Sequence, residues 1–222
     1  ILEDKFLEIH SKRYMTPKTV RHDFQSRGWK KVIGFATRNV PHRAHEFLLK
    51  KNVINADGLL IQPTVAQKEG GKYTEKAIRL SFEYLIEHEL ESEKFYLALV
   101  PARSLRAGPR EALLQAVIRR NFGCTHFIIG RDHSGLGGFY ERYEAQQLAA
   151  RFANELEVEI VKAREPYYCD ICCEIVDDDV CNHLITNPDV ITFISSVNIR
   201  RVQQNGGTAD SHIFNPKIYQ AI

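Results

Sequence analysis

Two histidines separated by two residues are the first candidates for chemistry. His42 and His45 follow the apolar stretch 31–35 through a polar turn at 37–39 and lead into a predicted helix. Two imidazoles at a helix N-terminus can donate hydrogen bonds to phosphate oxygens as charge develops in a transition state. The alternative is that one or both only cap the helix. Their position after a strand and a turn favours phosphate binding.

Two glycine-containing turns have the same relation to predicted strands and helices. Residues 106–111 enter a helix through Gly108, which allows a close backbone approach to a ligand. The charged pair within this segment could equally form an ordinary ion pair. Residues 130–137 combine glycines, whose amides can cradle an anion or a base, with the donors Arg131 and His133. Three such turns in one topological position indicate a ligand pocket.

Four of the five cysteines lie within positions 169–181. Cys-x-x-Cys followed by Cys-x-His suits a tetrahedral zinc ion (Zn2+), with Cys173 as a spare thiol, and the predicted ligands are Cys169, Cys172, Cys181 and His183. Such a closed set of four ligands would be structural. The alternatives are unmetallated thiols in a reducing cytoplasm and a redox motif. The redox interpretation is weaker, because the motif does not open a helix after a strand.

The elements that must position these residues alternate along the chain. Strands are predicted over 31–35, 58–61, 95–100, 125–129 and 158–161, and helices over 45–53, 74–89, 109–120 and 140–156. This alternation predicts crossover units and an α/β fold with a doubly wound parallel sheet, in which ligands bind outside the carboxyl ends of the strands. We expect a helical lead-in over 1–30, opened at Thr16-Pro17, an α/β core over 31–165, and an irregular Cys/His-containing subdomain over 166–222.

Composition excludes several classes of function. The 222 residues are 44% hydrophobic and 26% charged, as in a globular protein. The net charge of +2 argues against a nucleic-acid surface, and no apolar run approaches the ~20 residues of a membrane helix. The first residues contain neither a start Met nor a signal-peptide pattern, which suggests a cut fragment and a cytoplasmic location.

Several blocks resemble one known family in order and spacing. The chain from about Thr16 to the C-terminus is similar to the ATP sulfurylases (sulfate adenylyltransferases). The blocks that carry the resemblance are residues 37–39 with 42–45, 107–112, 121–127, 130–135 and, more loosely, 195–200. The resemblance implies a nucleotidyltransferase fold of the HxxH type. It also implies in-line transfer of a nucleotidyl group from a magnesium (Mg2+) complex of a nucleoside triphosphate, ATP first, to a small oxyanion.

The resemblance also implies roles for individual residues. The expected catalytic residues are Thr37, Arg38, Asn39, His42 and His45. The expected nucleotide-binding residues are Arg38, Asn39, His42, His45, Gly108, Gly130, Arg131, Asp132 and His133. Some bacterial members carry a similar cysteine cluster, and the family often forms dimers or larger assemblies, so a homo-oligomer is expected. The resemblance starts at about Thr16, so we do not expect the N-terminal accessory domain common in the family within these 222 residues.

Two departures from the family fall on the acceptor side. Ala36 stands where the family usually has a glutamine that contacts sulfate, and Leu105 stands where it usually has an arginine. A polar contact to a charged group contributes about 1.5–3 kcal/mol, so losing both contacts could lower sulfate turnover. The expected acceptor-binding residues are Ala36, Arg38, Arg103, Arg106 and Ala107.

Three interpretations of these departures remain open. The first is a true sulfurylase that tolerates both changes. The second is a different acceptor, such as a phosphonate or a phosphate ester, with ATP or CTP as the donor. The third is a nucleotide-binding module without catalysis, against which the intact His42, His45 and Arg38 argue.

Overall fold

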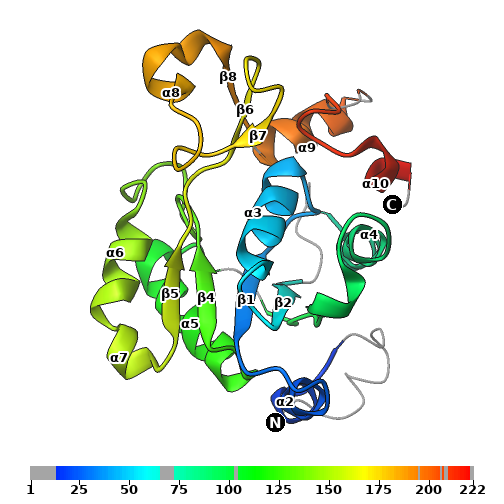
Figure 1. Cartoon of the computed structure of the whole chain (residues 1–222), viewed down its shortest axis with the longest axis vertical. Coiled ribbons are helices and arrows are strands. Elements are labelled where there is room, and N and C mark those ends of the chain that lie inside the picture. The colour runs from blue at the N-terminus through cyan, green and yellow to red at the C-terminus, as the bar shows by residue number, and fades with distance from the viewer. Residues whose placement is uncertain are drawn as a thin grey trace.

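A five-stranded parallel sheet forms the centre of the protein (Figure 1). The computed structural model describes residues 14–65, 73–102, 105–194, 196–205, 207 and 210–220. The sheet has the order β3-β2-β1-β4-β5 and consists of β1 (Val32–Thr37), β2 (Gly58–Pro63), β3 (Phe95–Leu97), β4 (His126–Ile129) and β5 (Glu159–Lys162). Every neighbouring pair is parallel. The predicted α/β class and parallel sheet are confirmed.

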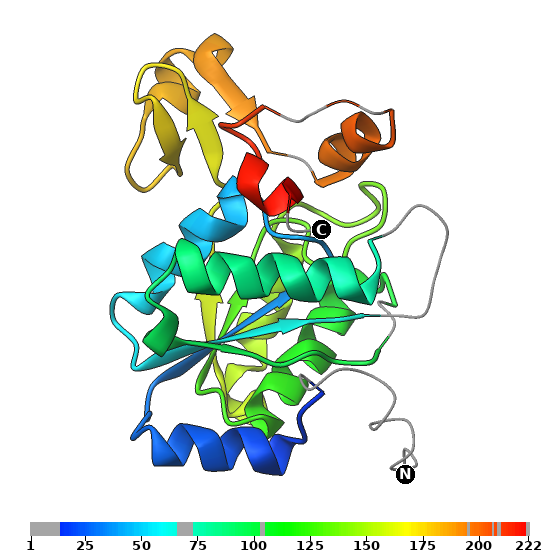
Figure 2. The ribbon, with the colours of Figure 1, turned by 90° about the vertical axis from the view of Figure 1, so that its right-hand side faces the viewer.

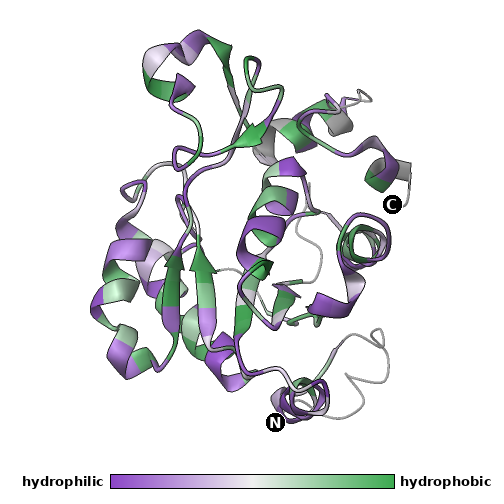
Figure 3. Cartoon of the chain, viewed as in Figure 1, coloured by the Kyte–Doolittle hydropathy of each residue, from purple (hydrophilic) through white to green (hydrophobic). Residues whose placement is uncertain are grey.

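Helices cover both faces of this sheet, as Figures 1 and 2 show. On one face α3 (Arg43–Val53) and α4 (Glu75–His88) enclose the largest apolar cluster, which includes Phe35, Leu49 and Phe82. The other face packs on α5 (Gly108–Asn121) and α6 (Glu144–Arg151), and α2 (Pro17–Ser26) covers its lower end. In Figure 3 the apolar residues follow the strands and the inner helix faces. Within the described residues, no helix is both long and apolar enough to cross a bilayer.

The helix starts follow local chemistry that the sequence contains. Thr16 caps α2 by accepting a hydrogen bond from the Thr19 amide at 3.2 Å, and Pro17 follows it in the first turn. Thr74 caps α4 in the same way through the amide of Ala77 at 3.1 Å.

One predicted helix is shorter and broken. In place of 140–156 the structure has α6 and the short α7 (Ala153–Leu156), separated at Phe152. Residues 139–143 are not helical, and Tyr140 packs on Gly108, where an added Cβ would lie 2.4 Å from the tyrosine ring. Glu157 then ends α7 in the left-handed region, at φ 52°.

The C-terminal part contains regular structure where the sequence predicts an irregular tail. The strands β6 (Tyr167–Cys169), β7 (Glu174–Val176) and β8 (Ile191–Phe193) form an antiparallel sheet. The short helix α8 (His183–Thr186) and the 3₁₀ turn η2 (Pro188–Val190) connect β7 to β8. A second 3₁₀ turn, η1 (Ser92–Lys94), lies in the core just before β3. We call residues 167–193 the satellite; Figures 1 and 2 place it beyond the end of the sheet where β5 leads into β6.

Two further helices return from the satellite to the core. They are α9 (Ser196–Gln204) and α10 (Pro216–Gln220), and we call the part of the chain from α9 to α10 the return segment. Ile199, Phe214 and Ile218 from this return segment belong to the same apolar cluster as α3 and α4. The return segment therefore packs on the face of the sheet from which the histidine pair projects.

Candidate active site

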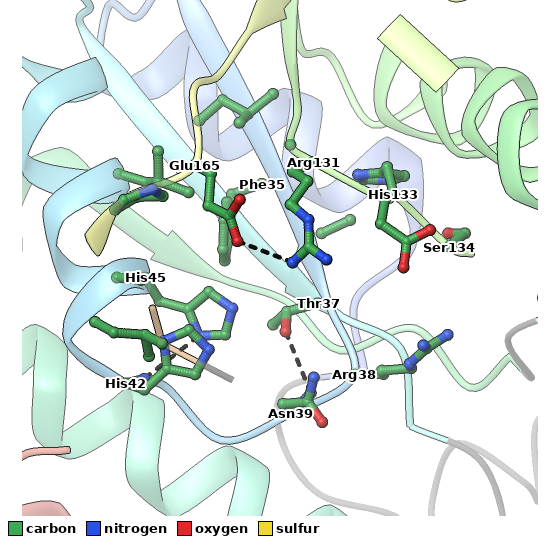
Figure 4. A pocket seen from close by; sticks show the side chains of 18 of the residues that line it. Phe35, Thr37, Arg38, Asn39, His42, His45, Arg131, His133, Ser134 and Glu165 are labelled. Carbon is green, nitrogen blue, oxygen red and sulfur yellow. Dashed lines mark hydrogen bonds and ion pairs between the residues drawn. The ribbon is translucent and has the colours of Figure 1, made fainter. Parts of the chain in front are cut away.

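The main pocket lies where the strand order of the sheet changes direction. Strand β1 has β2 on one side and β4 on the other, and ligands of open α/β sheets bind at such a switch point, outside the carboxyl ends of the strands. A pocket of about 250 Å³ opens there, and Figure 4 shows its walls. The predicted residues that it brings together are Ala36, Thr37, Arg38, Asn39, His42, His45, Gly130, Arg131, Asp132 and His133.

The histidine pair stands at the N-terminus of α3. The rings of His42 and His45 stack with their centroids 3.7 Å apart and their planes 15° from parallel. The His42 amide donates to Nδ1 of His45 at 3.4 Å, so His45 also has the capping role that the sequence left open. On its other side, Nε2 of His42 lies 2.9 Å from Oγ of Ser196, at the start of α9. The C-terminal return segment therefore reaches into the site.

Burial keeps both imidazoles uncharged in the free protein. It lowers the pKa of His45 to about 4, and burial followed by repulsion from His45 lowers the pKa of His42 well below its usual value. Nδ1 of His42 is buried and has no hydrogen-bond partner within the described structure. A bound phosphate group would accept a hydrogen bond from an imidazole N–H, and its negative charge would raise the pKa values of His42 and His45.

The lowered pKa of His45 predicts that the folded protein loses stability in acid. The unfolded chain binds a proton at His45 below about pH 6.5, whereas the folded chain resists it down to about pH 4. Stability is therefore unaffected above pH 6.5 and is lost as pH falls from 6.5 towards 4, by up to ~1.4 kcal/mol per pH unit for this group. Urea unfolding at pH 7.5, 6.5, 5.5 and 4.5 should show a shallower loss in His45→Gln. Replacing the exposed His22 by Asn should leave the pH dependence as it was, and equal slopes in all three proteins would refute the assignment.

The turn between β1 and α3 is held from three sides. The Asn39 amide donates to Oγ1 of Thr37 at 3.2 Å, the Thr64 amide donates to the Thr37 carbonyl at 2.8 Å, and Arg200 of α9 donates to Oδ1 of Asn39. Arg38 points away from the histidine pair in Figure 4. Its pKa is lowered, first by burial and then by repulsion from Arg106.

The loop after β4 uses left-handed backbone to approach the pocket. Asp132 and Ser134 have φ values of 46° and 57°. A Cβ on Gly135 would lie 1.8 Å from Oδ1 of Asp132, so a side chain at this position would displace the Asp132 carboxylate. Arg131 pairs with Glu165 at 2.8 Å, beyond the end of β5. Sequence reasoning missed Glu165, although its place after a predicted strand was a usable signal.

A hydrogen-bond chain from α5 determines which nitrogen of His133 carries the proton. The Glu111 carboxylate accepts from the Ala107 amide at 3.2 Å and from Nε2 of Gln115 at 3.0 Å, and Nε2 also contacts Oγ of Ser134 at 2.9 Å. Oε1 of Gln115 therefore faces Nε2 of His133 at 2.9 Å, and that nitrogen must donate. Burial, followed by Arg119 and Arg38, lowers the pKa of His133 to about 3, so the ring is neutral and Nδ1 is a hydrogen-bond acceptor.

Replacing Gln115 tests this chain. Gln115→Leu keeps the side-chain volume but removes the acceptor for His133, so we expect a mixture of tautomers and nucleotide binding weakened by roughly tenfold. Nitrogen-15 NMR of the histidine rings reports the tautomer, and titration reports the affinity. The matched control is Gln147→Leu, which changes an exposed glutamine of α6. An unaltered His133 spectrum in Gln115→Leu would disprove the role of the chain.

Three predicted residues lie elsewhere, and one lies outside the described part of the chain. Gly108 does not line the main pocket; it has φ 50°, and its amide donates to the Ser134 carbonyl at 3.1 Å. Ala107 caps α5, and Arg106 lines a smaller adjoining pocket together with Arg38. Arg103 falls in a segment outside the described residues.

The cysteine cluster of the satellite has the dimensions of a metal site. The ligand atoms of Cys169, Cys172, Cys181 and His183 all lie within 4.8 Å of one another. Nδ1 of the histidine is 3.4, 3.5 and 3.4 Å from the three sulfurs, in chain order, and the second and third sulfurs are 3.7 Å apart. Bond lengths of about 2.3 Å to sulfur and 2.0–2.1 Å to nitrogen give tetrahedral edges of about 3.8 and 3.5 Å. Cys173 is exposed and contacts the Asp170 carbonyl instead.

A parallel sheet with imidazoles, arginines and a glycine loop at its switch point defines an α/β protein with a polar ligand pocket at the carboxyl ends of its strands. A family model described as ATP-sulfurylase matches residues 11–222, and the chain belongs to that family. It is 36% identical over 212 residues to the sulfate adenylyltransferase of Pyrococcus abyssi, covering 96% of this chain and 55% of that protein. It is also 36% identical over 218 residues to the sulfate adenylyltransferase of Carboxydothermus hydrogenoformans, covering 98% and 56%. The chain thus spans about half the length of these curated relatives.

A solved structure supports the fold. The hexameric APS kinase from Thiobacillus denitrificans superimposes with a TM-score of 0.72 and 23% identity, over 96% of this chain and 40% of that one. At this identity the likeness concerns the fold alone.

Proposed function

We propose that this chain transfers a nucleotidyl group from a nucleoside triphosphate, ATP first, to a small oxyanion, with release of pyrophosphate. The observation that carries the proposal is the stacked, uncharged pair His42 and His45 at the N-terminus of α3, inside a switch-point pocket. Membership of the ATP-sulfurylase family and the names of the curated relatives support it.

The proposed mechanism needs no covalent intermediate. An acceptor oxygen attacks the α-phosphorus in line, a new P–O bond forms, and the bond to the pyrophosphate oxygen breaks. His42 and His45 donate N–H groups to the phosphate oxygens, where negative charge increases as pyrophosphate departs. Thr37 and Asn39 keep the turn in place beside the reacting phosphorus. The protein contributes positioning and preorganised charge.

A magnesium ion would arrive with the triphosphate, and the pocket offers a suitable oxygen ligand. Oδ1 of Asp132 is buried and lacks a hydrogen-bond partner within the described structure. Magnesium binds one or two carboxylates together with substrate phosphates, so Asp132 is the residue we assign to it. The ion would neutralise phosphate charge; the residues of the chain still orient the nucleotide.

We assign the satellite cluster to a structural zinc ion. The four ligand atoms fit a tetrahedral shell, which leaves no position for a substrate. Zinc would hold the turn between β6 and β7 to the start of α8.

The acceptor is open between sulfate and another oxyanion. Ala36 places only a methyl group in the pocket wall, and Leu105 is 63% exposed, so neither side chain can bind an anion. The direct experiment is pyrophosphate release with ATP or CTP and magnesium, against sulfate, phosphate, phosphonates and phosphate esters. Pyrophosphate release with sulfate would mean that sulfate transfer tolerates the changes at Ala36 and Leu105. Release only with another acceptor makes them determinants of specificity. If no acceptor in the panel gives pyrophosphate release although the protein still binds nucleotide, the chain is a non-catalytic module.

A further inference from the structure

Among the described residues, Arg119 is the largest side chain that is fully buried, although it carries a guanidinium group. Its Nη2 donates to the Gln62 carbonyl at 2.9 Å, and its Nη1 lies 3.5 Å from the Gln115 carbonyl. Within the described structure its Nε has no partner, and no carboxylate forms an ion pair with it. Arginine is rarely buried without an ion pair, so this charge is a candidate for a role in function.

The guanidinium group lies directly behind the main pocket. Arg119 is near the end of α5 and does not line the pocket itself, but Gln115, one turn earlier, does. Gln62 pairs in register with Ala36, another pocket residue. On a third side, the guanidinium carbon lies 5.5 Å from the ring centroid of Phe127. That ring meets the imidazole of His133 edge-on, with the centroids 5.6 Å apart. Single residues therefore separate the charge from the pocket.

The central strand β1 leaves room for this arginine. A Cβ on Gly34, in the middle of β1, would lie 2.7 Å from Cγ of Arg119 and 3.2 Å from Sγ of Cys124. A side chain at residue 34 would therefore displace the buried stem of the arginine. The position of the guanidinium group depends on β1, β2 and α5 together, so it is fixed by the core of the fold.

Arg119 stays charged at neutral pH. Burial, which attraction from Cys124 and Glu111 offsets only in part, lowers the pKa of Arg119 to about 10. Burial also raises the pKa of Cys124 to about 12, so this thiol carries no charge at pH 7. Glu111 acts on Arg38 as well. A lowered arginine pKa means that the charged form is less favourable here than in water, and an anion in the pocket would stabilise it again.

The field of Arg119 reaches the wall of the pocket. Burial is the largest cause of the lowered pKa of His133, about 3, and Arg119 is the next, ahead of Arg38. His133 lines the main pocket. A charge that acts on this imidazole also acts on an anion beside it, and salt screens buried charges much less than exposed ones.

We propose that Arg119 is a positioning residue that acts through its charge: without touching the nucleotide, it holds the phosphates in the main pocket and makes the site prefer the more highly charged nucleotides. The inference rests on the proposed function, because it requires nucleotide phosphates in this pocket. A purely structural arginine would have a different signature, since its loss would loosen the pocket for every ligand alike.

A series of ligands that differ in charge separates these two roles. Adenosine, AMP and the non-hydrolysable α,β-methylene ATP are titrated calorimetrically, without added magnesium, into the unaltered 222-residue chain and into Arg119→Met. We expect Arg119→Met to weaken the ATP analogue by roughly tenfold or more, AMP by less, and adenosine by under about twofold. The matched control is Arg120→Met, which removes the same charge from the half-buried neighbour that pairs with Glu157, and which should weaken each ligand by under about twofold.

Two further variants keep the test decisive. Arg119→Gln removes the charge but keeps a donor for the Gln62 carbonyl, and it replaces Arg119→Met if urea unfolding shows that the methionine variant is not folded. Arg119→Lys keeps a positive charge and should keep most of the preference for the ATP analogue over adenosine. Equal weakening of all three ligands in the neutral variants would show a structural role and overturn the inference alone. If the unaltered chain does not bind the ATP analogue even with magnesium, the proposed function fails, and the inference fails with it.

Discussion

Replacing His42 or His45 by asparagine should lower the rate of pyrophosphate release by about 10²–10³-fold, the loss typical of one transition-state donor. Affinity for the nucleotide should fall far less, by under about tenfold, because the donors gain most when charge builds on the phosphate oxygens. The two rings stack 3.7 Å apart and act as one unit, so the double variant should cost less than the product of the single losses.

The measurement is steady-state release of pyrophosphate, with nucleotide affinity determined separately. The matched control is His88→Asn, because His88 also stacks on a ring, that of Tyr84 at 4.3 Å, but lies on α4 outside both pockets. If the His42 and His45 variants weakened nucleotide binding as much as turnover, the pair would serve ground-state binding alone. If they matched His88→Asn, the proposed mechanism would be wrong.

The sequence predicts the central sheet because β1 to β4 are mostly buried apolar runs, whereas β5 at the sheet edge is half-buried or exposed. β1 and β2 are flanked by turns and amphipathic helices, so period and length agree on one assignment. The pocket residues follow from the same logic, since the carboxyl ends of parallel strands meet at one edge. The satellite strands were missed because each is only 3 residues long, too short for an alternating pattern to show.

The missed contacts of the site all depend on packing between distant segments. Ser196 reaches His42 across 154 positions of sequence, and only the return of α9 to the core brings them together. Gln115 was readable as the partner of Glu111 one helical turn earlier, but its contact with His133 requires the folded loop after β4. Local pattern thus predicts which residues lie at the pocket, and tertiary packing decides how they are oriented.

Removing the proposed zinc should unfold the satellite while leaving the central sheet intact. The buried apolar cluster of the satellite consists of Tyr167, Cys169, Val176 and Cys181, and two of these four are proposed ligands. So small a core cannot offset the entropy of ordering its residues without the metal, whose binding in zinc-finger peptides contributes an apparent ~10–16 kcal/mol at pH 7.

Metal analysis of the purified chain should find one zinc per chain, and chelation should release it. Hydrogen exchange over 167–193 should then accelerate strongly, with little change in β1 and β4. Cys172→Ser should lose zinc, whereas Cys173→Ser, which changes the exposed neighbour, should keep it. Equal zinc content in the two variants would rule out the assigned ligand set.

Loss of zinc should also lower activity, because the satellite positions the segment that leads to Ser196. β8 ends at Phe193, and α9 begins at Ser196 with the contact to His42. On the other side, Lys51 of α3 binds Asp177 of the satellite at 2.5 Å. Chelation should therefore lower turnover by less than the His42 variant does, since it loosens the orientation of the imidazole without removing it. Ser196→Ala should reproduce that smaller loss with zinc still bound, and an unchanged rate in both cases would mean that the satellite does not position the histidine.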